Sequence, residues 1–539
     1  MWTLVTAAGP SIPFGRLFLC FARRPDREAE SNQPMPTSRP PQTASRKAAR
    51  AAQRAGTRHL HRKVKKVKAP RLSAAVLDGL EQINLQAAGI DVGSKENYVA
   101  VPAHTVKAGA PSVRAFGVFT ADVDATVAWL QECGITTVAM EATGIYWMAL
   151  YDKLEAARIE VVLVEPHSVK QVPGRKSDVL DCQWLMQLHT YGLLRGSFRP
   201  DEPIRRLRTL TRQRLELVQA AAACQQHIQH ALIPMNLQLH LVVSDVVGDT
   251  GLRILEAILK GERDPEVLVK LRDPHCKKST VAEMKAALKG HYTDAGLFVL
   301  QQNLDLWKVY QRELEKCDQQ ILLVLTQMPT ARPAALPAPP KPAPPAADNA
   351  NGKQRKKKAA GGNNELRIKP EELGAQLQRL CGVNLMAVCG LNLLSVLMLI
   401  AEIGVDMSRW PNAKAFCSWL GLCPGTRISG GKVLSRRTRH VVNRASVILR
   451  VAALAIGRTE SWLGRFYRRK KAHLGAPKAI TATARKLACV VYHMLKYQED
   501  FLPLDLAVYE WKAQEQRMRR LRREAEELGW EIVEKKKVA

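Results

Sequence analysis

The sequence predicts an α/β domain near the amino terminus, followed by two long helices and an all-helical carboxyl-terminal domain. Short β-branched runs that alternate with helical segments between residues 88 and 190 indicate the α/β domain. Apolar residues spaced by three and four between residues 203 and 325 indicate the long helices. A Pro/Ala-rich stretch at residues 333–345 marks the boundary before the last domain.

The predicted α/β domain, residues 85–200, opens with three strands. Residues 88–92 and 98–101 flank a Gly-Ser-Lys-Glu-Asn turn and form a hairpin, and residues 113–119 form the third strand. The remaining elements are a helix over 122–133, a strand over 136–140, a helix over 146–157, a strand over 161–164 and a helix over 177–190. Three meandering strands followed by alternating helices and strands are typical of the ribonuclease-H-like layout, a mixed sheet with helices packed on it.

Residues 201–328 are predicted to be helical, with a small helical insert between two long helices. One apolar stripe comprises Leu207, Leu210, Leu217, Ala221, Cys224 and Ile228, and the other Leu297, Leu300, Leu304, Trp307, Leu314, Cys317 and Ile321. Such stripes suit either an antiparallel helical hairpin or a dimerising coiled coil. The first helix also carries five arginines that could lie along a phosphate backbone: Arg205, Arg206, Arg208, Arg212 and Arg214.

The other segments differ in composition. Residues 1–84 are predicted to be a disordered basic extension, and residues 329–366 a Pro/Ala- and Lys-rich linker. A helical domain over 367–500 and a charged helix and tail over 501–539 complete the chain. The predicted helices there are 385–403, 413–420, 438–456, 476–495 and 504–528, and residues 421–432 are predicted to be a Gly/Pro-rich loop.

The formal net charge of +31 favours a polyanionic partner, because each phosphate that Lys or Arg neutralises releases condensed counterions. The eleven cysteines form no C-x-x-C pair, which argues against a zinc ribbon or a disulfide framework. The most apolar run, residues 391–401, is shorter than the roughly 20 residues of a membrane span. We therefore expect a reduced, intracellular setting and no membrane insertion.

Four carboxylates are candidates for a metal site. Asp91 lies on the first predicted strand and Glu141 at the end of the fourth, while Asp178 and Asp181 lie one turn apart on the last helix. In open α/β sheets the functional crevice lies outside the carboxyl ends of strands, so these side chains are expected to meet there. Two Mg²⁺ ions held by such oxygen ligands suit phosphodiester chemistry. The alternative is structural: Asp91 is a turn residue, Glu141 is a surface residue at a strand end, and Asp178 and Asp181 lie on a solvated helix face.

Ser429 is the candidate nucleophile of the second domain. It lies between Arg427 and Gly430-Gly431-Lys432, which supply cations and a flexible backbone. Ser435 is the rival, and a serine in an ordinary glycine turn is the structural alternative. Phosphate contacts are expected from Arg427, Lys432, Arg436, Arg437, Arg439 and Arg444.

At these residues the sequence resembles the DEDD insertion-sequence transposases of the IS-one-ten family, whose amino-terminal domain is RuvC-like. The three acidic blocks of that family match Gly89–Gly93, Met140–Gly144 and Lys176–Asp181. Its carboxyl-terminal transposase domain matches residues 389–404 and 420–432, although Cys389-Gly390-Leu391-Asn392 replaces the usual Pro-Gly-Ile-Gly-like turn. The basic amino terminus and the Pro-rich insertion depart from the family pattern.

The resemblance implies a recombinase that cuts and rejoins DNA strands to move its own element. Asp91, Glu141, Asp178 and Asp181 would hold Mg²⁺, or Mn²⁺ as the alternative, and Ser429 would attack the phosphodiester and hold the strand covalently. It also implies a structured guide RNA and a homo-oligomer, dimer or tetramer, whose catalytic domains meet across subunits. The implied setting is the bacterial cytoplasm, in association with the nucleoid.

Two other functions fit parts of the same pattern. A RuvC-like, structure-specific DNA endonuclease would hydrolyse DNA with the metal site alone and form no covalent serine adduct. A non-catalytic, basic nucleic-acid-binding protein would use the four acids only structurally. Variants of the acids and of Ser429 distinguish these hypotheses.

Overall fold

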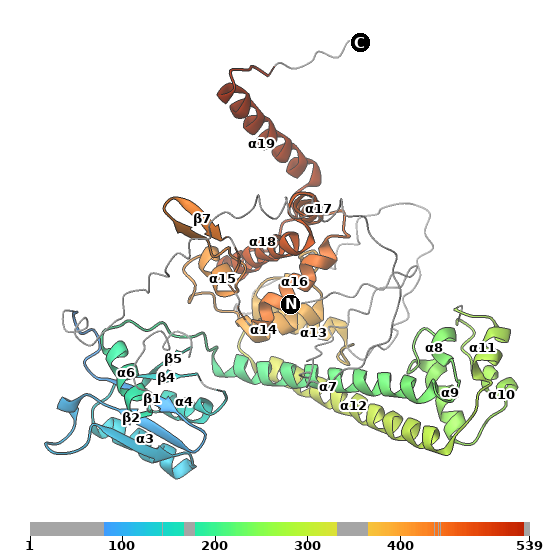
Figure 1. Ribbon diagram of the computed structural model, residues 1–539, viewed down its shortest axis with the longest axis horizontal. Coiled ribbons are helices and arrows are strands. Elements are labelled where there is room, and N and C mark those ends of the chain that lie inside the picture. Colours follow the sequence, from blue (N-terminus) through green and yellow to red (C-terminus); the bar gives the residue numbers. More distant parts are fainter. Residues whose placement is uncertain are drawn as a thin grey trace, which may run out of the picture. The chain divides into compact units, whose positions relative to one another are not determined.

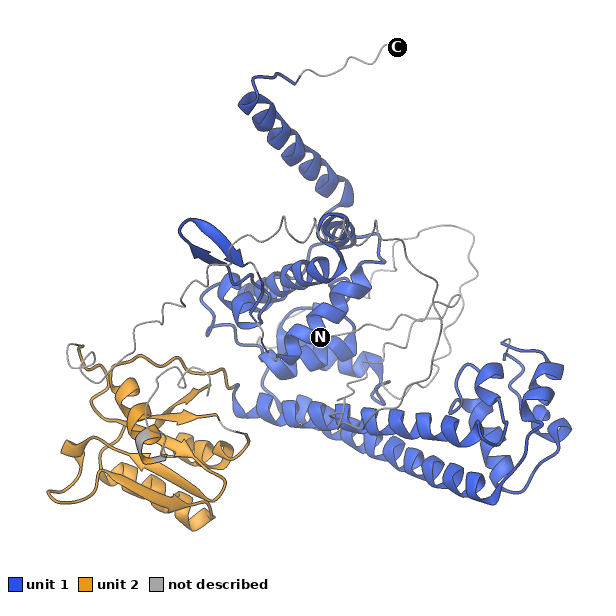
Figure 2. Ribbon diagram, viewed as in Figure 1, with its two compact units in different colours: residues 1–16, 200–539 blue, residues 17–199 orange. Residues whose placement is uncertain are grey.

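The computed structural model describes residues 80–142, 144–165, 178–276, 278–330, 365–435, 437–439, 441 and 443–532, although the side chains of Asp178 and Leu180 are not described. The predicted basic extension up to residue 79 and the linker over 331–364 lie outside the described residues. The described residues fall into two compact units. In chain order, the first unit ends at Arg199 (orange, keyed as unit 2 in Figure 2) and the second unit begins at Pro200 (blue, keyed as unit 1).

The first unit contains a mixed five-stranded sheet (Figure 1). Its strands are β1 (Ala87–Val92), β2 (Glu96–Ala100), β3 (Val113–Gly117), β4 (Thr137–Glu141) and β5 (Glu160–Val164), in the spatial order β3-β2-β1-β4-β5. β1, β2 and β3 pair antiparallel, whereas β4 is parallel to both β1 and β5. This order and the mixed pairing fit a ribonuclease-H-like domain, as the sequence predicts.

Side-chain alternation assigns the two faces of the sheet. On one face Ile90, Val138 and Met140 are buried in a cluster with residues of α3 (Thr120–Glu132) and α4 (Trp147–Ala156). On the other face Ala139 and Val164 pack against Leu185 of α6 (Asp178–Thr190). A short 3₁₀ helix, η1 (Ala103–Thr105), lies between β2 and β3.

In the second unit α7 (Glu202–Leu232) and α12 (Asp294–Gln327) pack against each other along their lengths. Arg214 bonds to Asp318 at 2.6 Å, and His227 Nδ1 lies 3.2 Å from Asn303 Oδ1, so the two helices run antiparallel. Between them in sequence lie α8 (Leu239–Val242), α9 (Asp249–Leu259), α10 (Pro265–Lys270) and α11 (Val281–Leu288). These short helices share a buried apolar cluster with the adjoining ends of α7 and α12. Dimerisation through the long helices stays a prediction.

The expected phosphate contact of Arg214 is wrong. Its side chain is 4% exposed, and its partner Asp318 is fully buried. Arg208 and Arg212 likewise bond to Glu402, on α14 (Leu393–Ile403), instead of facing solvent alone. These arginines hold elements of the unit together.

The carboxyl-terminal helices differ from the predicted ones at several ends. They are α13 (Pro370–Cys381), the 3₁₀ helix η2 (Leu385–Ala387), α14, α15 (Ala413–Trp419), α16 (Arg444–Ile456), α17 (Trp462–Leu474), α18 (Ala476–Tyr497) and α19 (Leu506–Glu527). The helix predicted over 385–403 is interrupted because Gly390 adopts φ +88°, after which Asn392 caps α14. α16 begins only after the cap residue Asn443, and α17 is an additional helix that periodicity did not indicate.

Candidate active site

Asp91 and Glu141 lie next to each other at the carboxyl ends of two paired strands. β1 and β4 are parallel with Ile90 opposite Met140, and Asp91 and Glu141 are the next residues on each strand. Ile90 and Met140 are buried on the α3/α4 face. Because side chains alternate along a strand, Asp91 and Glu141 belong to the opposite face, the one that α6 covers.

The direction of α6 brings its two aspartates to the same edge. Near the helix end, the His189 ring nitrogen Nε2 lies 2.8 Å from Thr137 Oγ1, and Asn84 Nδ2 donates to the His189 carbonyl at 2.8 Å. Asn84 and Thr137 lie at the amino ends of β1 and β4, so α6 runs antiparallel to these strands. Its first turn, which carries Asp178 and Asp181, therefore lies at their carboxyl ends.

Gly89 sets the distance between α6 and the sheet. A Cβ atom at this position would lie 2.3 Å from the Cys182 carbonyl oxygen and 2.4 Å from the Met186 backbone nitrogen. Any larger residue would therefore push the helix away from β1. The sequence marks Gly89 only as part of an acidic block, because the close approach comes from a helix almost a hundred residues later.

The Cys182 thiol lies within the electrostatic field of the carboxylates. Burial is the main reason that its pKa is raised to about 12, and the nearby negative charges of Asp91 and Asp181 raise it further. One carboxylate from β1 and one from α6 thus act on the same thiol. The neutral thiol fills the space between helix and sheet without adding another charge.

This edge of the sheet fits a hard divalent cation. Asp91, Glu141 and Asp181 are each partly exposed, as an open metal site requires, and their oxygen atoms are the donors that such ions prefer. Asp178 is the first residue of α6, and its side chain lies outside the description. Among the described side chains no three acidic, histidine or cysteine groups already converge on one point. The three described carboxylates are thus gathered at one edge but do not form a closed cage.

Ser429 lies in a two-stranded hairpin rather than in the predicted irregular loop. β6 (Arg427–Ser429) pairs with β7 (Lys432–Ser435), and Ser429 is opposite Lys432. The turn consists of Gly430 at φ +53° and Gly431 at φ +74°, a conformation that suits glycine and the twist of a tight hairpin. Ser429 is exposed.

Basic residues surround this hairpin. Arg427, Lys432, Arg437, Arg439 and Arg444 are all exposed, whereas Arg436 lies outside the described residues. The stem extends beyond β6 and β7, because the Gly425 backbone donates to the Arg437 carbonyl at 2.8 Å and Pro424 pairs with Thr438. No aspartate or glutamate occurs between Asp406 and Glu460. The hairpin is therefore a positively charged projection with a hydroxyl group beside its turn.

Two family models match the chain. One, a transposase model of the IS110 DEDD type, matches residues 88–235, and the other, described as transposase IS116/IS110/IS902 family, matches residues 383–468. The chain is an IS110-family transposase. No curated protein matches it.

The two matches include the candidate residues of both units. The first match contains all four acids of the transposase, and the second contains Ser429 and the basic hairpin. Membership makes the transposase a DNA-binding, DNA-recombining enzyme, and its DEDD domain suggests use of a divalent metal ion. Within the described part of the chain, every helix is too short or too polar to cross a membrane.

Proposed function

We propose that this transposase cleaves and rejoins DNA strands with the quartet Asp91, Glu141, Asp178 and Asp181 and with Ser429 as nucleophile. The observation that carries the proposal is the antiparallel course of α6, which directs its aspartates to the edge where Asp91 and Glu141 lie. This is the geometry expected of a RuvC-like catalytic domain. Ser429 belongs to the other compact unit, on an exposed hairpin.

The four carboxylates would hold Mg²⁺, with Mn²⁺ as the alternative. When bound, such an ion stabilises the negative charge that develops on a phosphodiester under attack. Like charges at one edge repel each other, and a bound cation offsets that cost. Gly89 and Cys182 act indirectly, because they fix the helix that carries Asp178 and Asp181.

In the serine step the Oγ atom of Ser429 would form a bond to phosphorus while the bond from phosphorus to the departing sugar oxygen breaks. The hydroxyl proton leaves Oγ, and the departing oxygen takes up a proton, so that a serine phosphodiester and a free sugar hydroxyl result. Ser435 is the less suitable nucleophile because its Oγ already accepts a bond from the Arg437 backbone at 3.2 Å. Ser429 is the more exposed of the two.

The basic residues would position nucleic acid. We propose that Arg427, Lys432, Arg436, Arg437, Arg439 and Arg444 contact phosphates, which fixes the register of DNA without reading its sequence. A structured guide RNA would supply sequence recognition, and a dimer or tetramer would bring the two catalytic domains together. The reaction would take place at the nucleoid of a bacterial cytoplasm.

The test is recombination of a plasmid that carries the element ends and its flanking non-coding DNA. Asp91→Asn and Ser429→Ala should each abolish recombinant product. Asp91→Asn acts by removing a carboxylate of the metal site, whereas Ser429→Ala leaves the metal site intact. Ser435→Ala is the matched control and should retain activity. A protein–DNA adduct that survives denaturation should form with Ser435→Ala and be absent with Ser429→Ala.

Other outcomes would point elsewhere. Cleavage that persists in Ser429→Ala without an adduct would indicate the RuvC-like endonuclease instead. Recombination by Asp91→Asn at the wild-type level would refute the quartet.

A further inference from the structure

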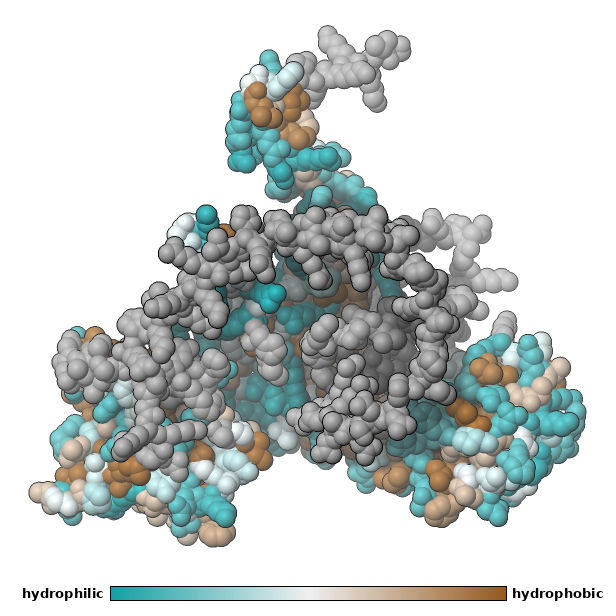
Figure 3. Space-filling view, viewed as in Figure 1, coloured by the Kyte–Doolittle hydropathy of each residue, from teal (hydrophilic) through white to brown (hydrophobic). Residues whose placement is uncertain are grey.

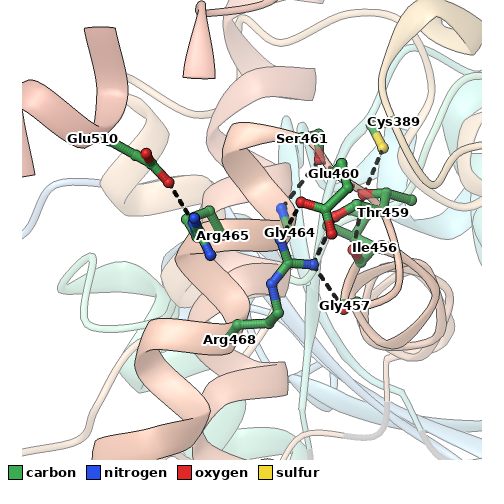
Figure 4. Close-up of polar contacts among 10 residues, drawn as sticks. All are labelled: Cys389, Ile456, Gly457, Thr459, Glu460, Ser461, Gly464, Arg465, Arg468 and Glu510. Carbon is green, nitrogen blue, oxygen red and sulfur yellow. Dashed lines mark hydrogen bonds and ion pairs between the residues drawn. The ribbon is translucent and has the colours of Figure 1, made fainter. Parts of the chain in front are cut away.

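The carboxyl-terminal helix α19 buries none of its residues within the described chain. Its first turns are tied to α17, where Arg465 bonds to Glu510 (Figure 4) and Tyr509 packs against Trp462 at a ring distance of 5.9 Å. Beyond these contacts the helix has both hydrophilic and hydrophobic surface (Figure 3). Most helical stability in proteins comes from the packing of an apolar face, and this helix of 22 residues has no buried residue within the described chain.

From Trp511 onward, apolar residues of α19 recur at heptad spacing, with Gln514 at one core position. Trp511, Met518 and Ala525 are seven residues apart, and Leu521 and Leu528 occupy the second core position of the same repeat. Trp511 is 60% exposed and Leu528 75% exposed. A seam with this spacing is the side of a helix that packs in a coiled coil.

The charge of α19 argues for a protein partner. The chain has a net charge of +31, yet α19 contains six basic and five acidic residues. Arg519, Arg520 and Arg523 are already paired with glutamates four residues away on the same helix. A nearly neutral, internally paired helix is a poor ligand for a polyanion.

The residues that flank the seam select a direction. In a parallel pair, Arg517 would face Arg522 of the partner subunit. This contact repels. In an antiparallel pair with Met518 opposite Leu521 of the partner subunit, Arg517 would instead face Glu524 of the partner subunit. On the other side of the seam, Glu515 would face Arg522 of the partner subunit.

We propose that α19 forms an antiparallel two-helix coiled coil with α19 of a second copy of this chain. Two-fold symmetry repeats each attractive contact, so the pair is held by four ion pairs around the Met518 and Leu521 layers. The Trp511 layer then meets Leu528 of the partner subunit. The proposal rests on the homo-oligomer of the proposed function and names the interface between its subunits. It does not depend on the catalytic residues.

Charge exchange tests the pairing in the full-length protein. The mass is measured by light scattering over a concentration series, and the dissociation constant is compared between variants. Arg517→Glu and Glu524→Arg should each raise the dissociation constant at least tenfold, and the double variant should restore it. Arg523→Glu, on the side of the helix away from the seam, is the matched control and should have no effect.

Each other result would overturn the proposal. Tighter association of Arg517→Glu would indicate a parallel pair, because the substitution would remove the Arg517–Arg522 repulsion. An unchanged constant in both single variants would exclude α19 from the interface. An unchanged mass together with weaker DNA or RNA binding would indicate a nucleic-acid surface.

Cysteine cross-linking gives an independent measurement. Met518→Cys together with Leu521→Cys should add a disulfide-linked dimer that the wild-type chain lacks under the same oxidant. Met518→Cys alone should add none, because residue 518 does not meet its own copy in the antiparallel register. These substitutions spare the folded core, since α19 buries no residue. If this dimer forms but the recombination tests of Asp91 and Ser429 fail, only the catalytic proposal is refuted.

Discussion

Individual arginines of this transposase have different roles, which depend on whether their side chains are buried or exposed. Arg214 donates to Asp318 at 2.6 Å and to the Glu365 carbonyl at 2.8 Å, and Asp318 also accepts from the Arg367 backbone at 2.8 Å. This buried network holds Glu365 and Arg367 beside α7 and α12. A buried charge of this kind contributes specificity of packing, and leaving it unpaired is costly.

We expect Arg214→Met to lower the free energy of unfolding by about 3–5 kcal/mol, because it leaves the Asp318 carboxylate buried without its cation. Denaturant unfolding of the second unit measures the change. Lys316→Ala, which removes the exposed partner of Glu313 three residues away, is the control and should cost less than about 1 kcal/mol. Equal effects of the two substitutions would contradict this reading.

Cys489 is predicted to be an unusually reactive thiol. A hydrogen bond from Cys417, at a sulfur–sulfur distance of 3.6 Å, and the charges of Arg485 and Lys486 lower the pKa of Cys489. It also lines a pocket of about 320 Å³. The thiolate, which is the form that reacts with alkylating agents, is therefore more populated at Cys489 than at an ordinary cysteine.

Alkylation by iodoacetamide, followed site by site with mass spectrometry, should be fastest at Cys489. Its rate should rise with pH through a midpoint below that of an ordinary cysteine, because deprotonation creates the nucleophile. Cys417→Ala removes the donor and should raise the midpoint, whereas Cys417→Ser keeps a hydroxyl donor and should change it less. A midpoint near 9 in the wild-type chain would refute the prediction.

At the scale of elements, the candidate site depends on how closely α6 approaches β1. The helix contributes Asp178 and Asp181, but its height above the sheet is set by Gly89, and its far end is held by the bonds of His189 to Thr137 and Asn84. Burial lowers the pKa of His189, which keeps the ring neutral at this buried contact. Sheet, helix and glycine thus form one positioning unit.

Gly89→Ala should displace α6, because the added methyl group would clash with backbone atoms of the helix, which cannot move aside by side-chain rotation. We expect the free energy of unfolding to fall by about 1–3 kcal/mol. The rate of metal-dependent recombination should fall by more than this loss of stability accounts for. Gly374→Ala adds the same methyl group where the nearest atom is 3.6 Å away, within helix α13, and should be neutral or slightly stabilising. Wild-type recombination by Gly89→Ala would contradict the close approach.

At the scale of the whole molecule, the excess of positive charge governs DNA binding. Fifty-three consecutive residues, 407–459, lack any acidic side chain, and the exposed hairpin lies within them. The affinity for DNA should therefore fall steeply with salt, since each phosphate contact releases counterions.

Arg427→Ala and Lys432→Ala should each reduce the slope of log affinity against log salt concentration by about 0.9, the value for one phosphate contact. The sequence preference should stay the same, because phosphate contacts do not read bases. Fluorescence anisotropy with a labelled duplex over a salt series measures both. Lys316→Ala, far along the chain on α12, serves as the control, and an equal effect there would show that only net charge matters.

Periodicity predicted the order of strands and helices in the first unit because each element there is short, regular and amphipathic or fully buried. It was wrong where a single residue interrupts a pattern. Gly390 breaks the helix predicted over 385–403, and Asn443 delays the start of α16, since capping and left-handed backbone act locally against an apolar run. The burial of Arg214 was also missed, because its partner Asp318 lies on another helix.

The sequence alone determined the identities of the four acids, the hydroxyl beside two glycines and the positive charge around it, because these are properties of residue type and spacing. Tertiary structure decided which strand ends are neighbours, that α6 runs antiparallel to them, and that a two-glycine turn makes Ser429 part of an exposed hairpin. The reason is physical. Strand pairing and helix packing depend on contacts between residues far apart in the chain, and no local pattern contains them.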